Sequence, residues 1–562
     1  MSDSDKMTET ASTTSTTSTT PKNAPTTTTM PQDEETKDSH YPRRHPPSRI
    51  LFGSCNSQEH EQVIWPSVLH RNATSFVWAG DAIYADAFEI VKGRKVVKPA
   101  TPAVLRNLYG AQLQHTGYRA LLLQHNMTVL GAMDDHDYGT NNGDIEYRYR
   151  KESGMLYVDF LAASGTADLT VMADRAAAGK GVYGVKVFDF LRPVGDELLS
   201  DQQAGIDPDL LLSDATATAL SNRSVAVFVL DVRSNKTPWK KGWERFAEDF
   251  EGDFLGEEQW QWFEQAIARS TAQVNIIVQG LQVHSDRFYD GNEAEDWSRF
   301  PMAQHRLYQA ALQVGVNAPI LVSGDVHMAE LLRRDCRQHI GDSNGNSNDD
   351  TNSNANDHHF NTRSLLEVTT SGLTHSWGTS ICGRPESSLA CRTPYVNKCL
   401  AAGMHLAHMN HAWTEVVDVG HKGSVEGAKQ RYQYSLELNF GEFEFDWEER
   451  QVVIRIHGKD VGARPLLSTR WDFDALSGKQ ELPASGKLSS DHYERTWAKL
   501  STHGAQRDDW ICVNYRGLQS PALKAFGFVS PVSLVLFGMC LPIILPLILM
   551  YILMRTRGSK KK

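Results

Sequence analysis

The sequence predicts an α/β fold in which buried strands alternate with helices. Six apolar runs recur in the first two thirds of the chain, and continuous runs of this kind are typical of strands buried on both faces. The segments between the runs are long enough for helices, and residues 257–269 place Trp260, Phe263, Ala266 and Ile267 on one helical face. Each run ends in polar or ionisable side chains, as expected where ligands bind at the carboxyl edge of a sheet.

Length and composition favour one large domain with appendages. The chain has 562 residues, of which 40% are apolar and 13 are Trp, and this is enough to bury a sizeable core. A formal charge of −11 argues against nucleic acid as a partner, because a phosphate backbone requires a basic face. Seven cysteines are too few for a disulfide scaffold, and the pairing of those between positions 336 and 512 stays open.

The folded region is placed at residues 49–460, and low-complexity segments interrupt and flank it. Residues 1–46 are rich in Ser and Thr and are expected to be a disordered tail or an O-glycosylated stalk, without a secretory signal. Residues 341–359 predict a flexible, Asn-rich insertion. Residues 466–522 have the composition of a polar connector.

The end of the sequence has the pattern of a single membrane-spanning helix. Residues 526–554 contain no charge, and this length exceeds the roughly 20 residues that cross a bilayer core. The basic tail 555–562 favours the cytosol by the positive-inside rule, which places the large domain in the extracellular space or a lumen. A cytosolic, tail-anchored orientation stays open, because no signal peptide is visible. Four glycosylation sequons weakly support the lumenal orientation, at Asn72, Asn126, Asn222 and Asn235.

The most informative stretch is 128–144, where an apolar run ends in Asp134, Asp135, His136 and Asp137 before a Gly/Asn turn. Adjacent carboxylates repel one another, so they persist at a buried strand end mainly where a cation compensates them. The stretch therefore indicates a metal site with a histidine acid beside it. A solvated acidic turn is the plain alternative, and the stretch alone does not decide between the two.

The same arrangement recurs at the other strand ends. These runs deliver Cys55, Asp81, Asp231 with Arg233, His284, and Asp325 with His327. Singly, each has a structural alternative: an Asp caps a following helix, and a lone histidine is more often a satisfied core residue than a ligand. Together they favour a metal centre, because carboxylates with imidazole suit hard or borderline cations, and two such ions clamp a phosphate.

The strand ends carry Gly53-Ser54-Cys55, Gly80-Asp81-x-x-Tyr84, Asp134 to Gly139 with Asn141-Asn142, Leu230-Asp231-x-Arg233, Gly324-Asp325-Val326-His327 and Thr370 to Thr374. In this order, these motifs resemble those of the alkaline phosphatase D (PhoD-like) branch of the calcineurin-like metallophosphoesterases. The resemblance implies a four-layer αββα sandwich, with two sheets face to face and helices outside, over roughly residues 50–460. It also implies a multinuclear metal centre of iron with calcium, or of zinc or manganese.

The resemblance also implies a role for each matching position. Asp81 would bridge the metals, and an anionic Tyr84 and Cys55 would complete a ferric site. His136 would donate a proton to the leaving oxygen, and Asp137 would orient His136 through its other ring nitrogen. Arg233 would pair with phosphate oxygens through its planar fork. The implied metal ligands are Cys55, Asp81, Tyr84, Asp134, Asp135, Asp325 and His327.

The sequence thus predicts a membrane-anchored, metal-dependent phosphoric-ester hydrolase. We expect in-line attack on phosphorus by a metal-bound hydroxide, without a phosphoenzyme, on phosphomonoesters or phosphodiesters. A non-catalytic binding ectodomain on the same fold is the alternative, and the retention of both the acid and the ligands argues against it. The physiological substrate, metal identities, organelle and oligomeric state are left open.

Overall fold

The computed structural model describes residues 48–91, 94–124, 127–191, 222–285, 295–340, 360–379, 433–480 and 489–513, with short pieces between 538 and 550. All of them belong to one compact unit, Pro47–Lys562. The predicted N-terminal tail, the Asn-rich insertion and the basic C-terminal tail lie outside the described residues and stay predictions.

The first sheet has six strands in the order β15-β14-β13-β1-β2-β5. Strands β1 (Arg49–Gly53), β2 (Ser75–Ala79) and β5 (Thr128–Ala132) are parallel neighbours, with Phe52 opposite Val77 and Val77 opposite Leu130. Their carboxyl ends therefore meet at one edge. The antiparallel side of the sheet consists of β13 (Phe440–Asp446), β14 (Gln451–His457) and β15 (Leu467–Asp472).

The second sheet has eight strands, seven of them in the order β12-β10-β11-β9-β8-β7-β6, with β16 paired to β10. Strands β7 (Ser224–Val229), β8 (Val274–Val278), β9 (Pro319–Ser323) and β11 (Phe360–Thr370) are parallel to one another. Their carboxyl ends also share an edge. The remaining strands are β6 (Gly184–Asp189), β10 (Ala329–His339), β12 (Tyr434–Ser435) and β16 (Trp510–Val513).

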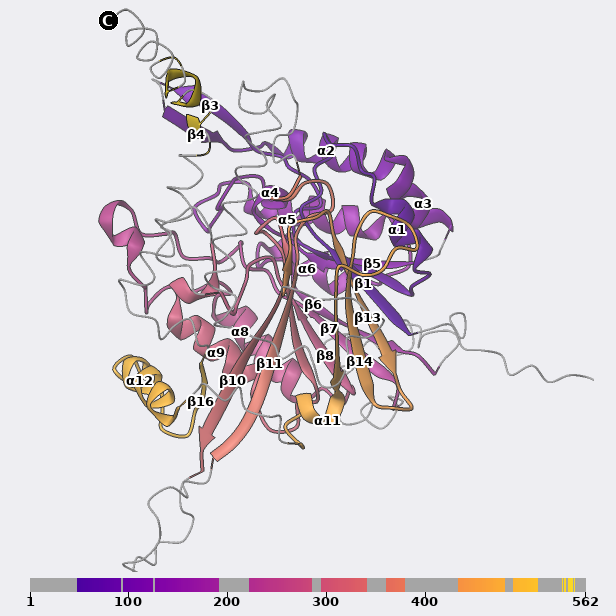
Figure 1. The fold of residues 1–562 in the computed structure, drawn as a ribbon. Helices are drawn as coiled ribbons and strands as arrows, with labels where there is room; N and C mark the ends of the chain where they lie inside the picture. The colour runs from indigo at the N-terminus through magenta and orange to yellow at the C-terminus, as the bar shows by residue number, and fades with distance from the viewer. Residues whose placement is uncertain are drawn as a thin grey trace, which may run out of the picture. The chain divides into compact units, whose positions relative to one another are not determined.

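Alternate residues of each strand pack into different layers, as the two-residue period of a strand requires. In β7, Val225 and Val227 join the core that the two sheets share, whereas Phe228 packs with α8 (Glu257–Ala268) and α9 (Pro301–Leu312). In β2, the Trp78 ring contacts rings of three helices outside the first sheet: α1 (Trp65–His70), α3 (Thr116–Gln124) and α5 (Arg150–Ala162). The predicted α/β class is confirmed, with two mixed sheets between helices (Figure 1).

The predicted helix at 257–269 is confirmed as α8, and its four apolar residues are buried. The other elements are α2 (Pro102–Gln114), α4 (Asp135–Tyr138), α6 (Thr170–Ala178), η3 (Gly242–Phe246), η5 (Trp297–Arg299), α11 (Phe473–Leu476), α12 (Ser490–Ser501) and the β3–β4 hairpin (Ala87–Val91 and Arg94–Lys98).

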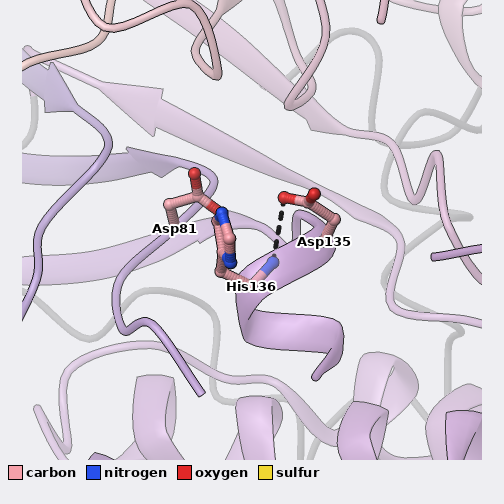
Figure 2. Close-up of side chains that lie close together, drawn as sticks. All are labelled: Asp81, Asp135 and His136. Atoms are coloured by element: carbon pink, nitrogen blue, oxygen red, sulfur yellow. Dashed lines mark hydrogen bonds between the residues drawn. The ribbon is translucent and has the colours of Figure 1, made fainter. Parts of the chain in front are cut away.

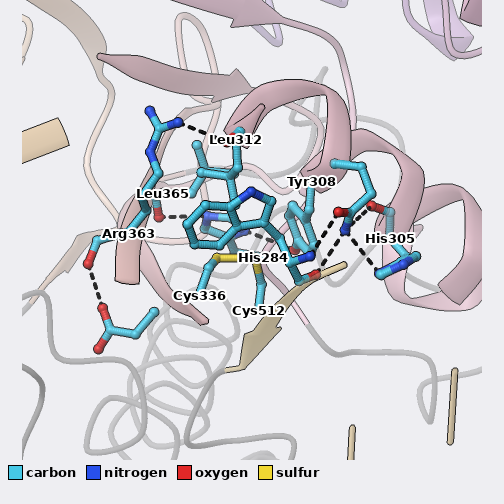
Figure 3. The surroundings of a disulfide bond; sticks show 12 residues. His284, His305, Tyr308, Leu312, Cys336, Arg363, Leu365 and Cys512 are labelled. Carbon is cyan, nitrogen blue, oxygen red and sulfur yellow. Dashed lines mark hydrogen bonds between the residues drawn. A yellow bond between two sulfur atoms is a disulfide. The ribbon is translucent and has the colours of Figure 1, made fainter. Parts of the chain in front are cut away.

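The predicted polar connector at 466–522 requires correction, because much of it belongs to the folded domain. Strand β15 extends the first sheet, and β16 extends the second through its pairing with β10. A disulfide between Cys336 and Cys512 joins β10 to β16, with the two Cα atoms 4.0 Å apart (Figure 3). Both strands are short: β15 has a polar face made of Ser468, Arg470 and Asp472, and β16 has only four residues, so neither stands out from the polar sequence around it. The other three cysteines of this region, Cys382, Cys391 and Cys399, lie outside the described residues.

The predicted membrane span at 526–554 lies largely outside the described residues. Its described pieces are helical and expose apolar side chains, including Leu545 and Leu547 at 53% and 55%. Within the part of the chain that the structure describes, no helix is both long enough and apolar enough to cross a membrane.

Candidate metal centre

Four of the predicted ligands follow strand ends with an unusual backbone conformation. Cys55 follows β1, Asp81 follows β2, and Asp325 and His327 follow β9, with φ angles of 57°, 53°, 66° and 54°. Side chains other than glycine rarely adopt this left-handed conformation, and each instance stores roughly 1–3 kcal/mol of strain. Such strain persists where the surrounding structure enforces it, and it is concentrated at functional sites.

These turns bring four aspartates together, and we call Asp81, Asp134, Asp135 and Asp325 the acidic rim. Ligand atoms of Asp81, Asp135 and His136 lie within 4.8 Å of one another, and so do those of Asp134, Asp135 and Asp325. Asp135 is common to both groups. Figure 2 shows the imidazole of His136 between the carboxylates of Asp81 and Asp135. Asp81 belongs to only one of the two groups, and its bridging role stays a prediction.

Glycines leave room for the Asp134 carboxylate. A Cβ atom at Gly280, which follows β8, would lie 2.3 Å from Asp134 Cγ, and one at Gly80 would lie 2.5 Å from Asp134 Cβ. Both distances are too short for any side chain. The strand ends of both sheets thus close around one carboxylate, and this explains why a glycine occurs at each of these positions.

The acidic rim has the chemistry of a cation site. Asp81 Oδ1 and Asp134 Oδ2 are buried and have no hydrogen-bond partner among the described residues. Burial raises the pKa of Asp81 and Asp325 well above the usual range, and neighbouring aspartates add to this effect. Burial also raises the pKa of Asp134 to about 7, although Arg233 opposes it. A bound cation would satisfy both orphan oxygens and offset the repulsion, so the residues present fit a metal centre.

Cys55, Tyr84 and His327 lie beside the acidic rim. Cys55 Sγ is 3.4 Å from Asp81 Oδ2, and the Tyr84 hydroxyl is 3.3 Å from the same oxygen and 3.0 Å from His327 Nε2. Burial, together with the charge of Asp81, raises the pKa of both the Cys55 thiol and the Tyr84 phenol. Without a cation these two groups are neutral, and a strongly polarising ion would be needed to deprotonate them.

The histidine of the central motif has a different partner from the one predicted. His136 Nδ1 lies 2.5 Å from Asp86 Oδ1, and Asp86 ends the same strand-end segment that carries Asp81 and Tyr84. Burial opposes the charged imidazolium, but the carboxylates of Asp135, Asp81 and Asp86 outweigh burial and raise the pKa of His136 well above its usual value. Asp86 was missed because its distance from His136 along the chain hid the contact.

Asp137 does not contact the ring of His136 in this structure, which corrects its predicted role. Its Oδ1 accepts hydrogen bonds from the backbone amides of Ala82 at 3.0 Å and Ile83 at 3.3 Å, and its Oδ2 accepts one from the amide of Asp134 at 3.3 Å. The last contact is half of a capping box that begins α4. Asp137 therefore ties the turn after β2 to the turn after β5.

Arg233 also differs from its prediction as a phosphate ligand. Its side chain is 0% exposed. Its Nε lies 2.5 Å from Asp134 Oδ1, and its Nη1 lies 2.5 Å from Glu295 Oε2. Two arms of the guanidinium are therefore held by carboxylates, and only Nη2 lacks a hydrogen-bond partner among the described residues. Glu295 was not foreseen, since no motif marks it.

His284, left without a role by the sequence, is a satisfied core histidine. Its Nδ1 lies 3.1 Å from the Tyr308 hydroxyl and its Nε2 lies 2.9 Å from the carbonyl of Leu365 (Figure 3). The Thr370–Thr374 motif, in contrast, reaches the centre: the Ser371 hydroxyl lies 2.9 Å from Cys55 Sγ and accepts a hydrogen bond from the His327 amide at 2.5 Å.

A comparison with protein-family models agrees with the family predicted from the motifs. Residues 222–352 match the family model of the PhoD-like phosphatases, so the resemblance predicted from the motifs is confirmed. The match covers Arg233, Asp325 and His327, whereas Asp81 and Asp135 precede it. Among solved structures, the chain is similar to one titled "Structure of PhoD", with 12% identity and a TM-score of 0.43 over 76% of this chain and 70% of that one. No curated protein sequence matches the chain.

Proposed function

We propose that this PhoD-like chain is a metal-dependent hydrolase of phosphoric esters. The observation that carries the proposal is the pair of acidic groups that share Asp135, each with a buried, unpartnered carboxylate oxygen from Asp81 or Asp134 among the described residues. A protein that only bound a partner through this fold would gain nothing from keeping these repelling carboxylates and the strained turns that present them.

The acidic rim would hold the metal ions, with Cys55, Tyr84 and His327 available to complete the ligand set. Oxygen, nitrogen and sulfur donors together suit iron with calcium, and zinc or manganese are alternatives. When bound, such ions lower the pKa of a coordinated water and neutralise charge on the phosphoryl oxygens.

His136 is suited to protonate the leaving oxygen in an in-line displacement at phosphorus. The Asp86 carboxylate holds Nδ1, which fixes the ring and leaves the other ring nitrogen to face the acidic rim. The Asp86 carboxylate favours the protonated imidazole, so His136 can give a proton to the departing alkoxide. Tyr84 stacks on the His136 ring, with the centroids 4.0 Å apart, and limits its rotation.

We also propose that residues 526–554 anchor the protein in a membrane, with the catalytic domain in an extracellular or lumenal space. The exposed apolar helical pieces between 538 and 550 support the anchor. The disulfide between Cys336 and Cys512 supports the compartment, because disulfides persist in oxidising surroundings. Protease protection of the domain in sealed microsomes tests the orientation, and digestion from the cytosolic side would overturn it.

The enzymatic proposal is tested on the purified full chain in detergent. We expect bound metal, and hydrolysis of a chromogenic phosphomonoester or phosphodiester that chelation abolishes and one added ion restores. The ratio of the two rates would rank the ester types. A folded protein that binds no metal and turns over neither ester would contradict the proposal and favour a binding ectodomain.

A further inference from the structure

A chain of buried ion pairs leads away from the acidic rim. Arg233 bonds Asp134 through Nε and Glu295 through Nη1, as described above. Lys236 Nζ lies 3.1 Å from Glu295 Oε1, and the Trp239 indole donates to the same oxygen. Arg233, Lys236 and Asp134 are 0% exposed, and Glu295 is 2% exposed. Because these groups are shielded from water, each charge is compensated by the opposite charges beside it and not by solvent.

The two bonds of Arg233 determine where its third arm lies. A guanidinium is planar, so fixing Nε and Nη1 also fixes Nη2. Nη2 is buried, has no hydrogen-bond partner in the described part of the chain, and lies 3.9 Å from Asp135 Oδ1. Asp135 is the residue that the two acidic groups share. Arg233 is therefore held at the boundary of the acidic rim, touching Asp134 and stopping short of Asp135.

Glu295 provides the restraint from the opposite side. If its carboxylate were absent, the Nη1 arm would lose its partner, and the nearest unsatisfied charges would be those of the acidic rim. The guanidinium would then compete with a metal ion for the same oxygens. Glu295 also offsets the positive charge of Arg233, which preserves the negative potential that attracts a cation.

The position of Glu295 does not depend on its own side chain. The next residues are bonded to the loop after β8: the Trp297 amide donates to the Gln282 carbonyl at 3.0 Å, and the Ser285 hydroxyl donates to Asp296 at 3.0 Å. Asp296 also caps η5 through the amide of Ser298. A neutral isostere at position 295 should therefore leave the backbone in place.

We propose that Glu295 is a positioning residue for the metal centre, acting through Arg233 to keep the carboxylate oxygens of the acidic rim free for the metal. The inference rests on the proposed function, because it assumes that the acidic rim binds metal. Glu295 itself touches neither the metal nor the substrate.

The test is a titration of the metal-free full chain with Mn²⁺, followed by the electron paramagnetic resonance of the free ion. We expect Glu295→Gln to weaken Mn²⁺ binding by about 10-fold to 100-fold, the range typical of residues that support metal ligands. The matched control is Glu442→Gln, the same change at another buried glutamate in an arginine-rich cluster, which should leave Mn²⁺ affinity unchanged. Equal Mn²⁺ affinity in Glu295→Gln and the wild type would overturn the inference.

The outcomes separate this inference from the proposed function. If the wild-type chain binds no Mn²⁺ or other metal, the proposed function fails; if it binds and Glu295→Gln binds equally well, only the positioning role fails. Should Glu295→Gln not fold, Trp239→Phe removes one donor to Glu295 and keeps the ring. A several-fold loss of Mn²⁺ affinity without a change in thermal unfolding would then support the inference, and unchanged affinity would overturn it.

Discussion

The acidic rim contrasts with another cluster of charged residues, in which the carboxylates are paired with arginines. On the first sheet, Glu442 and Glu444 of β13 are surrounded by arginines. Arg71 Nη2 and Arg455 Nη1 lie 2.8 Å and 2.9 Å from Glu442 Oε1, and Arg49 Nη2 lies 2.8 Å from Glu444 Oε1. We call this set the arginine–glutamate cluster. Both carboxylates have partners there, whereas the acidic rim has orphan oxygens.

The pKa values of Glu442 in the arginine–glutamate cluster and of Asp81 in the acidic rim shift in opposite directions. Burial opposes the ionisation of Glu442, but His457 and Arg71 outweigh it and hold the pKa of Glu442 well below its usual range. In the acidic rim, burial raises the pKa of Asp81 and nearby aspartates add to the rise. Removing one partner of a buried ion pair destabilises the fold, whereas buried carboxyls with strongly raised pKa values are concentrated at functional sites. The contrast therefore separates a structural cluster from a functional one.

The largest effect is expected from Asp81→Asn in the acidic rim. Loss of a metal ligand should lower kcat/KM for a chromogenic ester by about 1,000-fold or more, roughly 4 kcal/mol of transition-state stabilisation. The folded protein should be as stable as the wild type or more so, because an unpaired buried carboxylate is removed. Metal content and kinetics test the predicted loss of activity, and urea unfolding tests the predicted stability. Full activity in this variant would contradict a catalytic role for the acidic rim.

The opposite pattern is expected from Glu442→Gln in the arginine–glutamate cluster. Removing one partner of a buried ion-pair network leaves uncompensated charge, at a cost of about 3–5 kcal/mol of unfolding free energy. Activity per folded molecule should not change. Urea unfolding, with activity measured at urea concentrations below the unfolding transition, tests this. A variant that lost activity without losing stability would contradict a purely structural role for Glu442.

Acid should also affect the arginine–glutamate cluster in a defined direction. The folded-state pKa of Glu442 is depressed, so its stabilising contribution is present above the unfolded-state pKa of about 4.3 and is lost as the pH falls below it. We expect wild-type stability to decline below about pH 4 more steeply than that of Glu442→Gln. Parallel declines in the two proteins would show that Glu442 does not cause the loss of stability at low pH.

An effect of intermediate size on kcat is expected at Asp86, and it should distinguish Asp86 from Asp137. Asp86→Asn should lower kcat by about 10-fold to 100-fold, less than the 10²–10⁴-fold that removal of a general acid costs, since His136 itself remains. Asp137→Asn should mainly lower stability, because it weakens hydrogen bonds to backbone amides. Equal kcat losses in the two variants, at equal stability, would contradict the pairing seen here.

The smallest effect concerns Glu367, a buried carboxyl that is neither paired nor orphaned. It accepts hydrogen bonds from the amides of Val283 and His284 and from the Ser323 hydroxyl, and burial raises its pKa to about 7. The folded-state pKa lies above the unfolded-state value of about 4.3, so this contribution is fully present below about pH 4.3 and is lost progressively as the pH rises to about 7, by at most about 1.4 kcal/mol per pH unit. Unfolding at pH 5.5 and 8 should show this loss in the wild type and not in Glu367→Gln.

Much of the fold and part of the site were predictable from local sequence. An apolar run that ends in an ionisable group identifies a buried strand and the side chain at its carboxyl end, and parallel strands bring such ends to one edge. This logic found Asp81, Asp134, Asp135 and Asp325, and with the motifs it found Cys55, Tyr84 and His327. The strands β15 and β16 were missed because β15 has one polar face and β16 is only four residues long within a polar stretch.

The sequence by itself thus determined which chemistry is delivered to the edge of the sheets, because strand period and strand ends are local properties. Only the tertiary structure decided which of these side chains form hydrogen bonds and ion pairs with one another. Asp86 rather than Asp137 holds His136, and Arg233 faces Asp134 across 99 positions of sequence and Glu295 across 62. These contacts depend on how left-handed turns aim side chains and on how two sheets meet, and both are set by packing over long distances in the chain.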